Sequence, residues 1–149
     1  MILGCDYDSH AVHLALYTPN EAVKMSFVRY SIQKGGEASI VVEELKGLLS
    51  GFKKDCELML VEAPVYIQNP KTSFVLARVR TLIEVAASAA GLKAISIEST
   101  KWKKLSLGQT RLNKEEVRVK INTMLGTDVD SHWADAAAMA LAGEKILRG

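Results

Sequence analysis

The stretch Ile2–Ser31, ILGCDYDSHAVHLALYTPNEAVKMSFVRYS, decides the fold of this protein. It contains three short apolar or alternating runs, at Ile2–Asp6, Ala11–Thr18 and Ala22–Ser31. The polar pairs Asp8-Ser9 and Pro19-Asn20 separate these runs and are typical of turns. Three short runs joined by tight turns predict three consecutive antiparallel strands.

After this stretch, helical patterns alternate with short apolar runs. Helical spacing of apolar residues covers Glu37–Ser50, Pro70–Ala90, the segment from the capping residue Asn113 to Gly126, and Ser131–Leu147. Leu58–Glu62 and Ala94–Ile97 indicate two further strands, and the first is apolar enough to be buried on both faces. This order predicts an α/β fold with a five-stranded mixed β-sheet, three antiparallel strands followed by two parallel ones, flanked by α-helices.

Length and composition predict one cytoplasmic domain over residues 1–149. Hydrophobic residues make up 48% of the chain and charged residues 24%, which is ordinary for a globular protein. The longest stretch without a charged residue is Ser9–Asn20, too short to span a bilayer, so we expect no membrane partner. Cys5 and Cys56 lie far apart without metal-binding spacing, which favours reduced, buried thiols in a cytosolic protein.

The net charge of +2 is unevenly distributed along the chain. Between residues 101 and 120 there are seven Lys and Arg residues against two Glu, and residues 70–80 hold three basic residues and no acid. The remainder of the chain is acidic. This distribution suits a protein that grips a polyanion on one face, and solvated helix faces explain it equally well.

Four side chains with the chemistry of metal ligands come from three separate segments. Asp6 and Glu62 each end an apolar strand and have no cation as a sequence neighbour, while His132 and Asp135 lie three residues apart on one helix face. A carboxylate in an apolar segment costs several kcal/mol unless it is compensated. The set suits a pair of hard divalent cations. The alternative is local: a turn cap at Asp6, a solvated strand end at Glu62, and a helix cap at His132 and Asp135.

These motifs, in this order, resemble the RuvC-like Holliday junction resolvases of the RNase H-like superfamily. The resemblance runs from Ile2 to about Glu144. The stretch at 2–6 (ILGCD) is similar to the family's first strand, the stretch at 60–62 (LVE) to its fourth strand, and His132-x-x-Asp135-Ala136 to its final helix. The sequence departs from the family at Tyr7-Asp8, where Pro-Gly is usual, and at His132, where Asp is commoner.

The resemblance implies an RNase H-like fold and a nuclease that resolves four-way DNA junctions by paired symmetric nicks, leaving a 5′-phosphate and a 3′-hydroxyl. It implies two Mg²⁺ or Mn²⁺ ions per active site, with Asp6, Glu62, His132 and Asp135 as the catalytic metal ligands. It also implies a homodimer, because two symmetric cuts call for two related sites. The helix at Pro70–Ala90 is the predicted interface, since it carries Phe74, Leu76 and Leu82 and the small residues of Ala86–Ala90.

The same resemblance assigns DNA contacts. The segment Thr100–Gly108, followed by Asn113-Lys114, is similar to a family segment with two DNA-contacting lysines, which fall here on Lys103 and Lys114. Further candidate DNA-binding residues are Lys101, Lys104, Arg78 and Arg80. Tyr66, in the loop after Glu62, is the candidate for wedging into the junction, and a half-buried rim aromatic is an equal alternative.

Two other functions remain open from the sequence. Another RNase H-like nuclease, such as an RNA–DNA hybrid nuclease or a transposase catalytic fragment, would share the carboxylate arrangement. A non-catalytic DNA-junction-binding protein would share the basic segments but carry a decayed site. Nothing in the sequence shows whether a branch-migration helicase is a partner.

Overall fold

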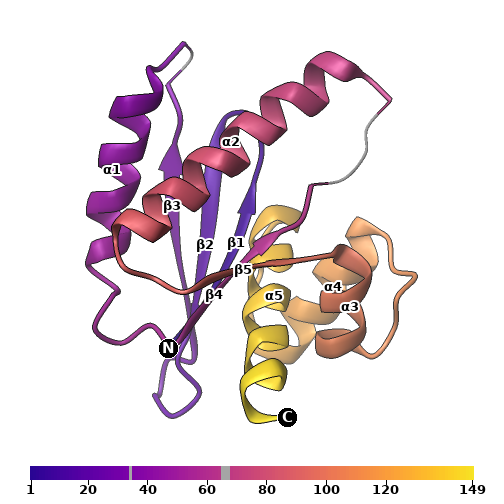
Figure 1. Ribbon diagram of the computed structural model, residues 1–149. Coiled ribbons are helices and arrows are strands. Elements are labelled where there is room, and N and C mark those ends of the chain that lie inside the picture. The colour runs from indigo at the N-terminus through magenta and orange to yellow at the C-terminus, as the bar shows by residue number, and fades with distance from the viewer. Residues whose placement is uncertain (34, 65–67) are drawn as a thin grey trace.

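The computed structural model describes residues 1–33, 35–64 and 68–149. Its centre is a five-stranded sheet of order β3-β2-β1-β4-β5 (Figure 1). The strands are β1 (Ile2–Tyr7), β2 (Ala11–Tyr17), β3 (Met25–Ser31), β4 (Leu58–Glu62) and β5 (Ala94–Ile97). The first three pair antiparallel, β4 runs parallel to β1, and β5 runs parallel to β4. The predicted mixed sheet is confirmed.

Helices cover both faces of the sheet (Figure 1). One face carries α1 (Ala38–Ser50) and α2 (Pro70–Ala89), and the other carries α3 (Ser99–Leu107), α4 (Lys114–Leu125) and α5 (Ser131–Arg148). Of the last three, α5 lies directly against β1 and β2, while α3 and α4 pack on α5. No helix within the described residues has the length and apolar character that a membrane span requires.

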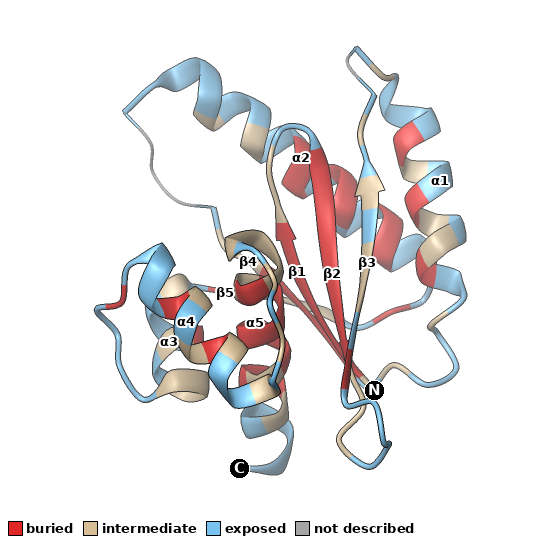
Figure 2. Ribbon diagram, turned by 180° about the vertical axis from the view of Figure 1, so that it is seen from behind, coloured by how far each residue is buried: buried red, intermediate tan, exposed pale blue. Residues whose placement is uncertain are grey.

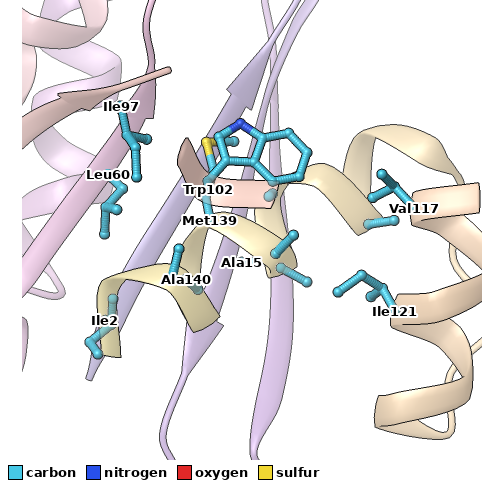
Figure 3. Close-up of a cluster of buried hydrophobic side chains, with 14 of the residues drawn as sticks. Ile2, Ala15, Leu60, Ile97, Trp102, Val117, Ile121, Met139 and Ala140 are labelled. Carbon is cyan, nitrogen blue, oxygen red and sulfur yellow. The ribbon is translucent and has the colours of Figure 1, made fainter. Parts of the chain in front are cut away.

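The alternation of side chains along β1 supplies both halves of the core. Leu3 and Cys5 point into the cluster under α1 and α2, whereas Ile2 points into the cluster under α5. The middle strands are therefore buried on both faces (Figure 2). Figure 3 shows the α5 side, where Trp102 packs above Met139. The same alternation places Asp6 on the α5 face, at the end of the strand.

Small residues allow α5 to lie very close to β1. The buried side of α5 is almost entirely small, comprising Ala134, Ala136, Ala137, Ala138, Ala140, Ala142 and Gly143. Gly4 of β1 faces this side, and a Cβ atom there would lie 1.9 Å from the carbonyl oxygen of Ala136. Only glycine therefore permits this packing, which brings the first turns of α5 alongside the end of β1.

The helix α3 was not predicted. Its nine residues bury one side chain, Trp102, and expose the lysines at 101 and 104, so no periodic apolar stripe marks it in the sequence. The one sequence signal that could have indicated this helix was Gly108, which ends it in the left-handed conformation with φ of 79°. The basic segment after β5 is thus a short helix anchored by a tryptophan.

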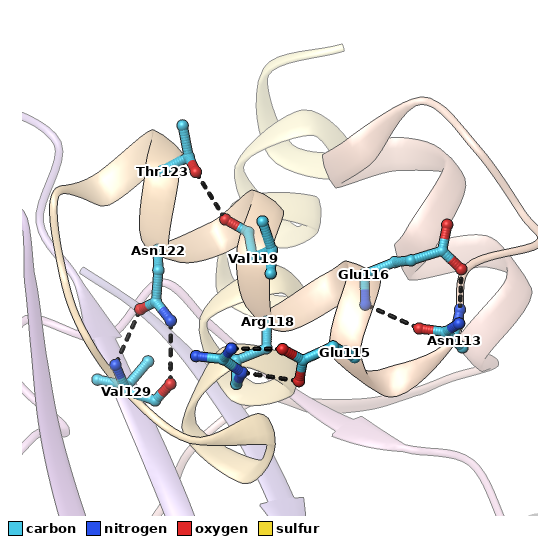
Figure 4. Close-up of polar contacts among 8 residues, drawn as sticks. All are labelled: Asn113, Glu115, Glu116, Arg118, Val119, Asn122, Thr123 and Val129. Carbon is cyan, nitrogen blue, oxygen red and sulfur yellow. Dashed lines mark hydrogen bonds and ion pairs between the residues drawn. The ribbon is translucent and has the colours of Figure 1, made fainter.

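Local hydrogen bonds define α4 and hold the loop after it (Figure 4). The predicted capping box is present: the Asn113 side chain accepts from the backbone N–H of Glu116, whose carboxylate accepts from the backbone N–H of Asn113. At the other end, the Asn122 side chain accepts from the N–H of Val129 at 2.9 Å and donates to its carbonyl oxygen at 3.0 Å. The loop between α4 and α5 is therefore fixed where it enters α5.

The start of α5 differs by one residue from the prediction. The N-cap is Asp130, whose carboxylate accepts from the backbone N–H of Trp133 at 3.1 Å, and Ser131 is the first helical residue. Aspartate is among the strongest N-cap residues. This cap sets the helical phase that places His132 and Asp135 over the end of β1.

The predicted dimer surface on α2 requires a correction. Leu82 and the neighbouring Ala86 and Ala87 are buried in the core of the subunit, so they offer no surface to a partner. Phe74 is 76% exposed and Val85 48% exposed, and these residues remain available.

Candidate active site

The four predicted ligand residues come together in one cavity. Asp6 from β1, Glu62 from β4, and His132 and Asp135 from α5 all line a cavity of about 370 Å³. Glu62 reaches it because β4 alternates: Leu58 and Leu60 face α5, and Glu62 follows on that face. Three segments that are distant in sequence therefore supply one site.

Asp6 and His132 form its tightest contact. Asp6 is 4% exposed, and its Oδ2 lies 2.8 Å from Nδ1 of His132. This hydrogen bond raises the pKa of His132 against the opposing effect of partial burial. The other ring nitrogen, Nε2, lies 3.5 Å from Oδ2 of Asp8. His132 is thus held between two carboxylates.

Glu62 and Asp135 have strongly perturbed acidities. Burial, followed by the charges of Asp6 and Asp135, raises the pKa of Glu62 to about 8. Burial and the charge of Asp6 raise the pKa of Asp135 to about 7, although Lys114 and Lys103 act to lower it. The three carboxylates of this partly buried cavity therefore repel one another, and the neighbouring positive charges are too few to stabilise all of them in the ionised form.

The cluster fits a divalent cation. Among the residues that the structure describes, no Lys or Arg forms an ion pair with Asp6, Glu62 or Asp135. Carboxylate oxygens and an imidazole nitrogen converge without a matching cation, and the perturbed pKa values of Glu62 and Asp135 report that deficit. Such a donor set suits Mg²⁺ or Mn²⁺.

Two side chains anchor the backbone of Glu62 from beneath the site. The carbonyl oxygen of Glu62 accepts from Nη1 of Arg80 at 2.8 Å and from the Tyr7 hydroxyl at 3.2 Å. Arg80 also donates to Ser96 Oγ at 2.9 Å and pairs with Glu84 at 2.7 Å. It is only 5% exposed, so the prediction of Arg80 as a DNA-binding residue is corrected to a role in holding the end of β4.

Trp102 supports Glu62 from the α3 side. It is 1% exposed, and its indole N–H is near enough to the Glu62 carboxyl to lower the pKa of that group, against the larger effect of burial. The indole nitrogen has no hydrogen bond of ordinary length within the described part of the chain. Because α3 carries both Trp102 and the lysines, it ties the basic segment to the acidic cavity.

His13 was missed by the sequence interpretation. The register of β1 and β2 places it directly opposite Asp6, and it is 4% exposed. Ligand atoms of Asp6, His13 and His132 all lie within 4.8 Å of one another. The turn predicted at Asp8-Ser9 could have indicated this role of His13, because folding the hairpin there brings position 13 beside position 6.

Asp8 shapes this hairpin. Its Oδ1 accepts from the backbone N–H groups of His10 at 2.7 Å and Ala11 at 2.8 Å. Partial burial acts to raise the pKa of Asp8, but these hydrogen bonds outweigh it and the pKa is lowered. Asp8 therefore stays ionised beside His132.

The predicted basic residues lie at different distances from the cavity. Lys114 lines it, and Lys103 is near enough to act on Asp135, with its Nζ 5.5 Å from the ring centre of Trp102. Lys101 and Lys104 are exposed on α3. Arg78 is exposed on α2 and donates to the carbonyl oxygen of Gly36 at 3.0 Å. Tyr66 lies outside the described residues.

Comparison with known proteins places the fold. No family model matches the sequence, and no curated protein matches it either. Among solved structures, Thermus thermophilus RuvC is similar over 99% of this chain and 95% of its own, with 20% identity and a TM-score of 0.75. Thermus thermophilus RuvC in complex with a Holliday junction substrate is similar over 99% and 94%, with 21% identity and a TM-score of 0.78. The chain therefore has the RNase H-like fold of RuvC, as its motifs predicted.

Proposed function

We propose that this protein is a metal-dependent endonuclease that resolves four-way DNA junctions. The observation that carries the proposal is the convergence of Asp6, Glu62, His132 and Asp135 in one cavity beside Lys114. This convergence occurs in a chain that shares its fold with RuvC, for which one solved structure holds a Holliday junction. Fold alone does not assign a function, but this donor set beside a lysine suits phosphodiester hydrolysis.

In this proposal Asp6, Glu62, His132 and Asp135 would together hold two metal ions. Asp6 contacts His132 and acts electrostatically on both Glu62 and Asp135, so it would be the ligand that the two ions share. The chemistry that two bound Mg²⁺ or Mn²⁺ ions supply is activation of water for in-line attack and stabilisation of the leaving 3′ oxygen. The products are then a 5′-phosphate and a 3′-hydroxyl.

The basic side chains bind the DNA backbone. Lys114 lies at the cavity, where it can contact a phosphate next to the cut, and Lys103 on α3 is near enough to act on Asp135. The exposed residues Lys101, Lys104 and Arg78 extend this surface. Contacts to phosphate carry no sequence information, so they suit recognition of a branched shape.

The proposed assembly is a two-fold dimer in the cytoplasm. Paired symmetric nicks require two sites related by the symmetry of the junction. Phe74, at 76% exposure near the start of α2, is the apolar side chain best placed to contribute to the interface. Sedimentation at micromolar concentration checks this point, and a species with the mass of one chain contradicts a stable dimer.

The decisive experiment incubates the protein and Mg²⁺ with a synthetic four-way junction, an RNA–DNA hybrid and a plain duplex. We expect nicks placed symmetrically across the junction and little cutting of the other two substrates. Asp6→Asn is expected to abolish cleavage and to leave junction binding largely intact, because phosphate contacts supply most of the affinity. Asp128→Asn, at an exposed position, is the matched control and is expected to keep full activity.

Each other outcome has a meaning. Preferential cutting of the hybrid identifies a hybrid nuclease, and junction binding without cutting in either Mg²⁺ or Mn²⁺ identifies a non-catalytic junction-binding protein. Full activity of Asp6→Asn refutes the assignment of the site.

A further inference from the structure

We propose that His13 completes, with Asp6 and His132, a site for a transition-metal ion held by two imidazoles and one carboxylate. The biological role of this site rests on the proposed nuclease function. The inference adds to that function the class of metal bound at one of the two ion positions. The ion belongs to the divalent transition metals that accept nitrogen ligands, a class that includes the Mn²⁺ of the proposed function, and Zn²⁺ is the probe used to test the site.

The backbone fixes the positions of all three residues. Asp6 and His13 are directly opposed on neighbouring antiparallel strands, so their side chains emerge side by side on the α5 face. His132 approaches from the first turn of α5, with its Nδ1 2.8 Å from Oδ2 of Asp6. Ligand atoms of the three residues lie within 4.8 Å of one another. Ligands of a tetrahedral Zn²⁺ are about 3.4 Å apart. Binding therefore requires the nearly parallel rings of His13 and His132 to turn so that one nitrogen of each points at a common position.

The burial of His13 is costly without such an ion. The side chain is 4% exposed, and its Nδ1 has no hydrogen-bond partner among residues 1–33, 35–64 and 68–149. Its ring stacks on that of His132, with centroids 4.9 Å apart and an interplanar angle of 9°, and it meets Trp133 edge-on at 4.7 Å. An apolar side chain would fill this space without leaving a buried nitrogen unpaired. A metal ion bound through Nδ1 would give that nitrogen a partner.

Asp8 supplies the support that a metal-bound histidine needs. A coordinating histidine ordinarily donates its second ring N–H to a carboxylate, which fixes its tautomer and orientation. Nδ1 of His132 faces Asp6, and Nε2 lies 3.5 Å from Oδ2 of Asp8. The carboxylate of Asp8 is itself fixed by two backbone N–H groups. His132 is therefore already oriented to bind an ion through Nδ1.

The test is a Zn²⁺ titration of the full chain without DNA, followed by calorimetry and by NMR of the histidine ring nitrogens. The three histidines give an internal comparison, since His10 is exposed at the hairpin tip. We expect the ring nitrogens of His13 and His132 to shift on saturation and those of His10 to stay unchanged. His13→Phe keeps an aromatic ring and His13→Gln keeps a polar group. Each is expected to weaken Zn²⁺ binding at least about tenfold, whereas His10→Gln has no effect.

Two results overturn the inference. The first is unchanged His13 nitrogen signals at Zn²⁺ saturation of the wild-type protein, a measurement that does not depend on whether the variants fold. The second is wild-type Zn²⁺ affinity in folded His13→Phe and His13→Gln. The Zn²⁺ titration contains no DNA, so its result does not depend on whether the protein cuts junctions. Failure to cut a junction in the separate cleavage assay therefore refutes the proposed function but not the metal site. Junction cutting combined with either overturning result refutes the metal site alone.

Discussion

Gly4→Ala tests the packing on which the candidate site depends. The new Cβ atom would lie 1.9 Å from the carbonyl oxygen of Ala136 and 2.7 Å from the backbone nitrogen of Ala140. Carbon and oxygen atoms do not approach closer than about 3.3 Å, so α5 has to retreat from β1 by more than about 1 Å. Both opposing atoms belong to the helix backbone, and a side-chain rotation cannot relieve the contact.

The expected cost follows from that geometry. Overpacking a core costs about 1 to 3 kcal/mol where side chains can adjust, so we expect Gly4→Ala to lower the free energy of unfolding by at least about 3 kcal/mol. The measurement is urea denaturation followed by circular dichroism at constant slope. Because α5 carries His132 and Asp135 past Asp6, a displacement of about 1 Å is also expected to reduce cleavage about 100-fold in the protein that remains folded.

Two other glycines calibrate the result. At Gly143 an added Cβ meets the side-chain atoms Leu60 Cδ1 and Ile2 Cγ2, which can move, so Gly143→Ala should cost less than Gly4→Ala. At Gly47, inside α1, nothing lies within 4 Å, and Gly47→Ala should stabilise the protein by about 1 kcal/mol. If Gly4→Ala is within 1 kcal/mol of wild type, or milder than Gly143→Ala, the close approach of α5 and β1 is wrong.

Two further predictions concern charge. Lys103→Ala and Lys114→Ala should each weaken junction binding and reduce the salt dependence of log K by about 0.9, because each removes one phosphate contact. Lys54→Ala, at an exposed turn position after α1, should change neither. The metal-free protein should lose stability as the pH rises from about 4 to about 8. In the folded state the pKa of Glu62 is raised to about 8 and that of Asp135 to about 7. The folded state therefore binds more protons than the unfolded state in this pH window. Each such proton lowers the free energy of unfolding by about 1.4 kcal/mol per pH unit, and Mg²⁺ should flatten the slope by binding the ionised carboxylates.

These two predictions have clear contrary outcomes. Unchanged salt slopes in both lysine variants assign the basic segment to solvated helix faces. Stability that rises with pH between about 4 and 8, or a slope that Mg²⁺ does not affect, shows that the carboxylates of the cavity are not in electrostatic conflict.

The sequence determined much of the fold because its patterns are local. Short apolar or alternating runs predicted all five strands, with turn pairs separating the first three, and the capping box at Asn113 predicted the start of α4. The same patterns placed Asp6 and Glu62 at strand ends and His132 with Asp135 on one helix face. The structure then brings these residues into one cavity. Each of these features depends on residues that are near one another in the chain.

The tertiary structure alone decided the rest, because the remaining features depend on contacts between distant segments. Arg80 carries the charge of a DNA-binding residue, but its guanidinium is buried. It donates to the carbonyl oxygen of Glu62 and to Ser96 Oγ and forms an ion pair with Glu84. His13 looks like one more residue of an apolar strand until strand register sets it beside Asp6. The short helix α3 owes its place to one buried tryptophan, whose environment comes from β4 and α5. Local propensity can predict a helix or a strand, but only packing determines which side chains it buries and which charges it brings face to face.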